Sequence, residues 1–422
     1  MSVSAKVTLL FVVFIDLLGQ GLVFPILNSL IMEPTSPLLA KSVSDPTRHL
    51  DYGLVIGAFF IAWFLGAPYI SKLSDVIGRK RAILICLAGA LAGYAITIAA
   101  LYVNSFLLLI LGRVITGFTA GNQPIAQAAM IDASANEEER VRNMGYIITG
   151  VSFGLVGGPI IGGLLSDPNL IGVNVGLIGA DAGLKLPFYA AFALVAVAIV
   201  MVLAFYREVR TETAAFTFKP AEIFELLWRV KSYPLVLRLV IVLVFFQIAN
   251  MTFYVFVDNY MSSRFGYGAF GGSMIMLTIG VALAFSSTFL VVPAQRRFGK
   301  QTIIAGNLIV WAVCAALFVL SPVALLCFVP VFAFYFVFGI SYPTFLGLFS
   351  ESVSDEEQGW VMGITIAVFT LIAGIVSLAG GDLMGINIRL PFYITIVAAL
   401  TGIVVLFFSW NSPAIKRLTR KA

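Results

Sequence analysis

Charged residues are scarce in this chain. Only 11% of its 422 residues are Asp, Glu, Lys or Arg, whereas soluble domains carry about a quarter. Hydrophobic residues make up 60% of the chain, and its mean hydropathy is +1.02. A chain of this composition needs lipid around it, so it is expected to be a multi-pass membrane protein rather than a soluble enzyme or a nucleic-acid-binding domain.

Histidine and cysteine are also scarce. The three cysteines, Cys86, Cys314 and Cys327, lie in apolar runs without the spacing of metal ligands or of a disulfide framework, so we expect small buried side chains. The single histidine, His49, lies in a polar segment and is expected to be solvated. No metal site and no cofactor are therefore expected, and proton chemistry inside the membrane would have to use carboxylates. No nucleotide-binding P-loop is present, so ATP is not expected to be the energy source.

Long apolar runs dominate what is present. A membrane-spanning helix needs roughly 20 such residues. The run that follows Lys6 is too long for a signal peptide and is taken as a retained first helix. We predict an all-α protein with spans at about 6–30, 52–72, 82–101, 106–131, 143–165, 187–206, 235–260, 271–293, 301–320, 322–349, 360–381 and 391–410.

The basic residues predict the orientation. With the N-terminus inside, 20 of the 26 Lys and Arg residues fall in cytoplasmic segments, which is the positive-inside pattern. Both termini are therefore expected in the cytoplasm and the protein in the inner (plasma) membrane. The same bias explains most of the net charge of +5, so no nucleic-acid partner is expected.

Three landmarks recur half a chain apart. The run Leu-Pro-Phe-Tyr begins at 186 and again at 390, an acidic run precedes both Gly145 and Gly363, and Gly78-Arg79 recurs as Gly299-Lys300. Parallel repeats of this kind place a substrate site at their interface near mid-membrane. We predict two pseudo-symmetric six-helix bundles, 1–206 and 235–410. They would be joined by a cytoplasmic linker, 207–234, with an interfacial amphipathic helix over 220–231, and followed by a basic tail, 411–422. The linker helix is expected to be a tether rather than a binding element.

The loop after the second span carries the best-defined motif. It reads Ser74-Asp75-Val-Ile-Gly78-Arg79-Lys-Arg, in which Gly78 allows the tight turn and Asp75 can pair with Arg79. The pair would hold the cytoplasmic side shut, although a plain positive-inside loop would look similar. The second copy, Ala294 to Lys300, lacks the acid.

The fifth predicted span carries small residues at every fourth position, namely Gly150, Gly154, Gly158 and Gly162, with Pro159 beside them. Such a stripe lets another helix approach closely, and the proline removes a backbone hydrogen bond and can bend the helix. Generic helix packing and a role in transport are both open for this stripe.

These motifs, with Asp16-Leu-Leu-Gly19 to Pro25 in the first span and Gly112-Arg113 with Gly117 in the fourth, resemble the major facilitator superfamily, and within it the twelve-helix drug:proton antiporters that include tetracycline efflux proteins. The resemblance covers the whole chain and implies the major facilitator fold. It also implies that Asp132 joins Asp75, Gly78 and Arg79 in a cytoplasmic gate, and that the stripe around Pro159 is an antiporter motif.

Asp16 and Arg113 are the acid and the base predicted deepest in the membrane, where ionisable groups are usually functional. Burial disfavours a carboxylate while a nearby guanidinium favours it, so Asp16 could load and release a proton. The alternative is a static pair that holds two helices together. Polar and aromatic residues expected to bind substrate are Gln20, Asn122, Gln123, Gln127, Gln247, Asn250, Tyr254, Tyr335 and Tyr342.

The sequence therefore predicts a secondary active transporter, not an enzyme. It would be a monomer that exports a small organic or amphipathic solute by proton-coupled antiport and alternating access. The alternative is a proton-coupled importer or symporter of a metabolite or siderophore. A membrane receptor or lipid-handling enzyme is disfavoured because the sequence offers no nucleophile–base–acid set.

Overall fold

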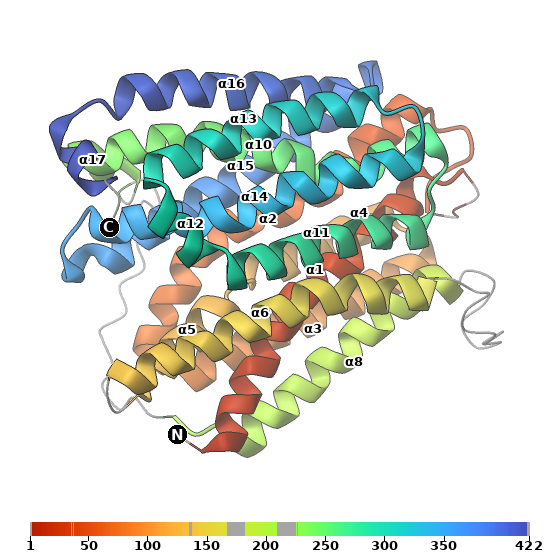
Figure 1. Ribbon diagram of the computed structural model, residues 1–422. Helices are drawn as coiled ribbons and strands as arrows, with labels where there is room; N and C mark the ends of the chain where they lie inside the picture. The colour runs from red at the N-terminus through yellow and green to blue at the C-terminus, as the bar shows by residue number, and fades with distance from the viewer. Residues whose placement is uncertain are drawn as a thin grey trace. The chain divides into compact units, whose positions relative to one another are not determined.

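The computed structural model describes residues 2–34, 36, 38–134, 137–166, 182–208, 225 and 227–419. Within them the chain is helical without strands, and twelve helical segments are long and apolar enough to cross a membrane. They are α1 (Val3–Met32), α2 (Asp45–Ile77), α3 (Arg79–Val103), α4 with α5 (Phe106–Phe118 and Asn122–Asp132), α6 (Glu137–Ser166), α8 (Ala182–Phe205), α10 (Pro234–Phe265), α11 (Ala269–Phe289), α13 (Lys300–Leu320), α14 (Ala324–Glu351), α15 (Gln358–Ile386) and α16 (Leu390–Ser409) (Figure 1).

All twelve predicted spans are confirmed, and the largest differences lie at helix ends. The helix α2 begins at Asp45, seven residues before the predicted start at 52, and α10 runs to Phe265 instead of 260. Ser44 precedes α2 and Pro46 lies in its first turn, a position that favours proline because its missing N–H is not needed there. The segment around His49 is therefore helical rather than a loop.

Short helices fill some of the connections. They are α12 (Val291–Arg297), α17 (Pro413–Leu418), and the 3₁₀ turns η1 (Arg229–Ser232) and η2 (Asp355–Glu357). In the predicted linker, 209–224 and 226 lie outside the described residues, and so does most of the predicted amphipathic helix. In the predicted tail, α17 is described and 420–422 are not.

The chain divides into two compact units. The first comprises Met1–Ser44, Leu54–Lys219 and Tyr267–Leu277, and the second comprises Asp45–Gly53, Pro220–Gly266 and Thr278–Ala422. The described residues of each unit have their own buried core, which is aliphatic in the first and aromatic in the second. The predicted boundaries at 206, 234 and 410 stay predictions.

The core of the first unit lies where α1, α3, α5 and α8 meet. Leu9 and Val12 of α1, Leu87 of α3, Met130 of α5 and Val202 of α8 are each at most 1% exposed. Against the other face of α1 packs α6, drawn in yellow in Figure 1. Burial of these side chains stabilises the unit by about 25 cal/mol for each Å² of apolar surface removed from water. This stabilisation does not depend on the polar contacts of the unit.

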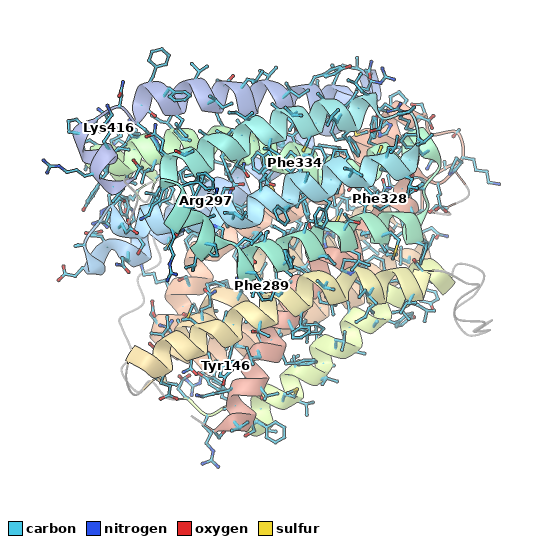
Figure 2. The ribbon with its side chains drawn as sticks, in the orientation of Figure 1. Tyr146, Phe289, Arg297, Phe328, Phe334 and Lys416 are labelled. Carbon is cyan, nitrogen blue, oxygen red and sulfur yellow. The ribbon has the colours of Figure 1, made fainter. Side chains whose placement is uncertain are left out.

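The core of the second unit is built from stacked rings. Trp311 of α13 stacks on Phe334 of α14 with ring centroids 4.5 Å apart, and Phe253 of α10 stacks on Phe334 at 4.2 Å. The indole N–H of Trp311 donates to the carbonyl of Phe334 at 2.9 Å, so the buried polar atom is satisfied. Figure 2 labels Phe334 within this unit, and Phe289, which is 62% exposed, on α11.

In each unit, a base near the start of the first span contacts an acid at the start of the fifth span. In the first unit, Lys6 donates to Glu139 and to Asn143, both at 2.9 Å. In the second, Arg229 donates to Glu357 at 2.5 Å. Glu139 and Glu357 belong to the repeated acidic runs that precede Gly145 and Gly363. The sequence repeat therefore corresponds to a repeated contact.

Candidate functional site

The acid predicted to couple proton movement lies in a polar cavity inside the first unit. Asp16 is at the middle of α1, and a cavity of about 60 Å³ opens beside it, enough for a few water molecules. Arg113, Asn122, Gln123, Tyr94 and Thr116 also line this cavity. The prediction that Asp16 and Arg113 share one polar environment agrees with this geometry, while their roles stay predictions.

Asp16 is held at both carboxylate oxygens by the start of α5. The side-chain amide of Asn122 donates to Oδ1 at 3.1 Å, and the backbone N–H of Gln123 donates to Oδ2 at 3.0 Å. The first N–H groups of a helix have no partners within the helix and carry a partial positive charge, so a carboxylate is favoured there. Two residues expected to bind substrate thus bind Asp16 itself.

Arg113 lies on the other wall of the cavity. It is 5% exposed, and its guanidinium carbon lies 4.3 Å from the ring centroid of Phe59 and 6.0 Å from that of Phe24. A guanidinium over an aromatic face gains about 0.5–2 kcal/mol, more when it is shielded from water. The two rings therefore stabilise a buried charge near the middle of the membrane span.

The fourth span is broken at this site, which the sequence reading did not predict. The helix α4 ends at Phe118, and α5 begins at Asn122 after a non-helical Gly121. The signal was present as Gly121 and Pro124 within the predicted span 106–131. Transporter sites commonly use discontinuous helices of this kind, whose ends face a charged group.

The glycine stripe of α6 packs against α1, on which Asp16 lies. A methyl group added at Gly154 would come within 2.6 Å of the carbonyl oxygen of Phe14, and one at Gly158 within 2.5 Å of that of Leu18. Gly150 and Gly162 make the equivalent approaches to Leu10 and Leu22, at 3.1 and 3.2 Å. The close approach expected for the stripe is present, and its partner is α1. Pro159 lies within α6 beside Gly158.

The loop after α2 forms a compact network of charges. Arg79 contacts Asp75 at 2.8 Å, donates from Nε to Asp132 at 3.1 Å, and donates to the hydroxyl of Ser74 at 2.6 Å. Gly78 turns the chain with φ +92°, a conformation that favours glycine. The four residues predicted to form a gate are thus brought together.

Two neighbours of this network were not predicted. The carboxylate of Glu208 accepts a hydrogen bond from the backbone N–H of Lys80 at 2.8 Å and lies against Gly78. Burial, followed by the carboxylates of Glu208 and Asp132, raises the pKa of Tyr206, while Arg79 opposes this rise. The Tyr206 hydroxyl therefore stays protonated and adds no charge. Neither contact could be read from a local pattern, since Glu208 lies 128 residues from Lys80.

The predicted binding residues of the second half lie on two helices of the second unit, Gln247, Asn250 and Tyr254 on α10 and Tyr335 and Tyr342 on α14. Asn250 donates to Gln247 at 3.4 Å, and the rings of Tyr254 and Tyr335 meet edge to face at 6.3 Å. Tyr342 stacks on Phe338 at 5.0 Å. In the first unit, Gln127 is half-buried on α5, and the side chain of Gln20 lies outside the described part of the chain.

The histidine expected at a solvated position is buried. His49 is 4% exposed, because α2 starts earlier than predicted. The carbonyl of His49 lies against Gly381 of α15. The expectation of a solvated histidine was therefore wrong. The three cysteines are buried, as predicted.

Comparison with known proteins places these features in context. The family model described as Major Facilitator Superfamily matches residues 9–377. The Quinolone resistance protein NorA of Staphylococcus aureus (strain MRSA252) is 26% identical over 94% of both chains. The Tetracycline resistance protein, class C, of Escherichia coli is 28% identical over 87% of this chain and 86% of its own.

Solved structures share the fold at lower identity. The human organic anion transporter MFSD10 (TETRAN) matches with a TM-score of 0.70 and 18% identity, covering 96% of this chain and 99% of its own. A D-xylose-proton symporter matches with a TM-score of 0.73 and 13% identity, covering 96% and 97%. At these identities the likeness concerns the fold alone.

Proposed function

Because the chain belongs to the Major Facilitator Superfamily, a family of membrane transporters rather than enzymes, we propose that it is a proton-coupled antiporter that exports small organic, amphipathic solutes. The single observation that carries this proposal is the Asp16 carboxylate, which lies on a membrane-spanning helix and lines a polar cavity that Arg113 also lines. An ionisable group at this depth is costly to keep and is usually functional.

The proposed cycle follows from the chemistry of this cavity. Asp16 takes up a proton from one side of the membrane and releases it to the other as the accessible side alternates. The charged form is favoured by hydrogen bonds from Asn122 and from the N–H of Gln123, whereas removal of water favours the neutral form. These opposing effects allow a change in hydration to move the proton.

The solute class rests on the relatives. The names of two relatives that match along nearly their whole length refer to resistance to quinolones and to tetracycline. Both are multi-ring organic molecules with polar groups, which suits a transporter whose second unit carries Tyr254, Tyr335 and Tyr342 together with the paired amides of Gln247 and Asn250. The importer is not favoured, since these named relatives are resistance proteins.

We further place both termini and the loop after α2 in the cytoplasm, because the basic residues concentrate there. On this placement the network of Asp75, Arg79 and Asp132 closes the cytoplasmic side, and it must open when solute enters from within the cell.

Proteoliposomes test the proposal. A quinolone or a tetracycline is loaded inside vesicles, an outside-acid proton gradient is imposed, and solute efflux and lumenal pH are followed together. We expect efflux accompanied by acidification of the lumen in the wild type. Asp16→Asn should lose the gradient-driven efflux yet keep solute–solute exchange. Efflux that needs no gradient, or gradient-driven efflux by Asp16→Asn, would contradict the proposal.

A further inference from the structure

The short helix α5 joins the proton site to the network of charges at the far end of its span. Its first residues, Asn122 and Gln123, bind Asp16, and its last residue, Asp132, accepts from Arg79. Eleven residues at ~1.5 Å per residue give roughly 16 Å between these ends. One rigid element therefore touches both parts of the proposed mechanism.

The start of α5 is built to hold an acceptor from another helix. Pro124 has no backbone N–H, and the N–H of Ile125 points back to the carbonyl of Gly121 at 3.5 Å. The backbone N–H of Gln123 and the side-chain amide of Asn122 donate to Asp16, and the backbone N–H of Asn122 is directed at it as well. A carboxylate of α1 supplies the cap that a side chain of α5 itself would otherwise provide.

We infer that α5 transmits the protonation state of Asp16 to the ion pair of Arg79 and Asp132, with Asn122 as the positioning residue. This inference rests on the proposed proton coupling. When a proton binds one carboxylate oxygen, that oxygen becomes a hydroxyl donor and faces a donor of α5, the side-chain amide of Asn122 at Oδ1 or the N–H of Gln123 at Oδ2. The contact at the protonated oxygen must then weaken or rearrange, and the other loses the negative charge that strengthened it.

Asn122 and Gln123 respond differently to this change. The side-chain amide of Asn122 can turn so that its oxygen accepts from protonated Asp16, and this buried oxygen has no hydrogen-bond partner among the described residues. The backbone N–H of Gln123 can only donate. Protonation therefore weakens the cap at the start of α5 and frees the helix to shift along α1, which moves Asp132 away from Arg79.

Other groups that face Asp16 are fixed on separate elements. Arg113 comes from α4, and Tyr94 and Cys86 come from α3. Val195 of α8 lines the same cavity, and Gly154 and Gly158 of α6 pack on the neighbours of Asp16 in α1. None of these groups is on the helix that ends at Asp132.

The test reads the far end of α5 while the proton site is changed. Ile131→Cys, next to Asp132, is introduced after Cys86, Cys314 and Cys327 are replaced by Ala. Its labelling rate by a thiol reagent is then measured in proteoliposomes from pH 5 to 9, together with solute-driven proton flux. We expect the labelling rate to change with pH at the same midpoint as transport.

Three variants make the result specific. Asp16→Asn should fix the labelling rate at its low-pH value. Asn122→Leu, similar in size but without the amide, should shift both midpoints about one unit to higher pH, a tenfold change in proton affinity. Asn122→Ser keeps a hydroxyl donor and should shift them less. The matched control, Ala128→Ser on the same helix, should leave both midpoints in place.

The two proposals can fail separately. If proton flux is coupled to solute but labelling at position 131 does not depend on pH, transmission through α5 is wrong and the proposed function stands. If the labelling retains its pH dependence in Asp16→Asn, transmission from Asp16 is also overturned. If no proton flux accompanies solute, the proposed function itself fails.

Discussion

The loops that follow α2 and α11 occupy equivalent places in the two halves, yet they carry different charges. In the first, Arg79 is 11% exposed at its side chain and contacts Asp75, Asp132 and Ser74. In the second, Lys300 contacts Glu351 at 2.5 Å, and the Glu351 side chain is 50% exposed. The position of Asp75 is taken by Arg296, as counted from the shared glycine.

Both halves have an ion pair between the loop and the end of the fourth helix, Arg79 with Asp132 and Lys300 with Glu351. Only the first half has an acid within the loop, Asp75. A planar guanidinium can bind two carboxylates and a hydroxyl at once, whereas an ammonium on a flexible stem acts as a point charge. The first loop is therefore a network of charges around Arg79, whereas the ion pair of the second loop joins Lys300 to the half-exposed Glu351. Their consequences for transport should differ accordingly.

The fifth helices of the two halves differ in the same direction. In α6, Gly150 and Gly154 approach the backbone of α1, whereas Val368 and Ile372 stand at the equivalent positions of α15. At these two positions the close approach of the fifth helix to the first is therefore a feature of the first half. Four substitutions test the contrast between the halves.

The largest effect is expected from Gly154→Ala. Its new methyl would lie 2.6 Å from the carbonyl oxygen of Phe14 and 2.8 Å from Cβ of Leu17, so α1 and α6 must separate. We expect a loss of about 2 kcal/mol in the free energy of unfolding. The matched control is Gly145→Ala on the same helix, which meets nothing within 4 Å and should be neutral or gain up to about 1 kcal/mol. Thermal unfolding in detergent measures both, and equal melting temperatures would refute the packing argument.

Arg79→Ala should have the next largest effect. It leaves Asp75 and Asp132 without their shared cation, and because both side chains are partly exposed we expect a loss of about 1–2 kcal/mol. Transport should become leaky, which is seen as faster proton entry without solute. Arg79→Lys keeps the charge but loses the planar guanidinium that binds two carboxylates at once, so we expect only partial recovery of stability and of tight coupling. Full recovery by lysine would mean that charge alone matters.

Lys300→Ala should cost less, about 0.5 kcal/mol, because its partner Glu351 is half exposed. The effect should shrink further when the salt concentration is raised from 0.1 to 1 M, since the Debye length falls from about 10 to about 3 Å. Unfolding at both salt concentrations is the measurement. A loss as large as that of Arg79→Ala would erase the contrast between the two loops.

Arg296→Asp should have the smallest effect. It restores the missing acid four residues before Lys300, and it should stabilise the loop by about 0.3–0.5 kcal/mol. Slower opening of the cytoplasmic side would appear as a lower transport rate with unchanged solute affinity. Arg296→Asn, which removes the base without adding an acid, serves as the control. An identical result for Asn and Asp would show that no new pair forms.

The sequence was sufficient for the architecture but not for the contacts of its polar residues. Runs of apolar residues predicted every span, because a helix in lipid must be long and apolar whatever it packs against. The four residues predicted for the gate do lie together, since three of them are close in the sequence, while their gating role stays a prediction. The partners of Asp16 were not, because Asn122 is 106 residues away and meets it only where the fourth span breaks.

The sequence did not predict the burial of His49 or the contact of Glu208 with the start of α3, for related reasons. A polar run beside a membrane span usually lies in water, yet this one continues α2 and packs on α15. Glu208 follows the end of α8 and reaches the start of α3, and no local pattern relates these ends. Contacts between segments that are distant in the sequence can be identified only in the folded structure.

The base–acid ties of Lys6 with Glu139 and of Arg229 with Glu357 have a consequence for how the chain can be divided. Each of these ion pairs joins two helices of the same half, so neither pair depends on the covalent connection between the halves. A gene split between codons 208 and 225 should therefore yield two polypeptides that insert independently and regain activity when produced together, whereas a split inside either tied half should not.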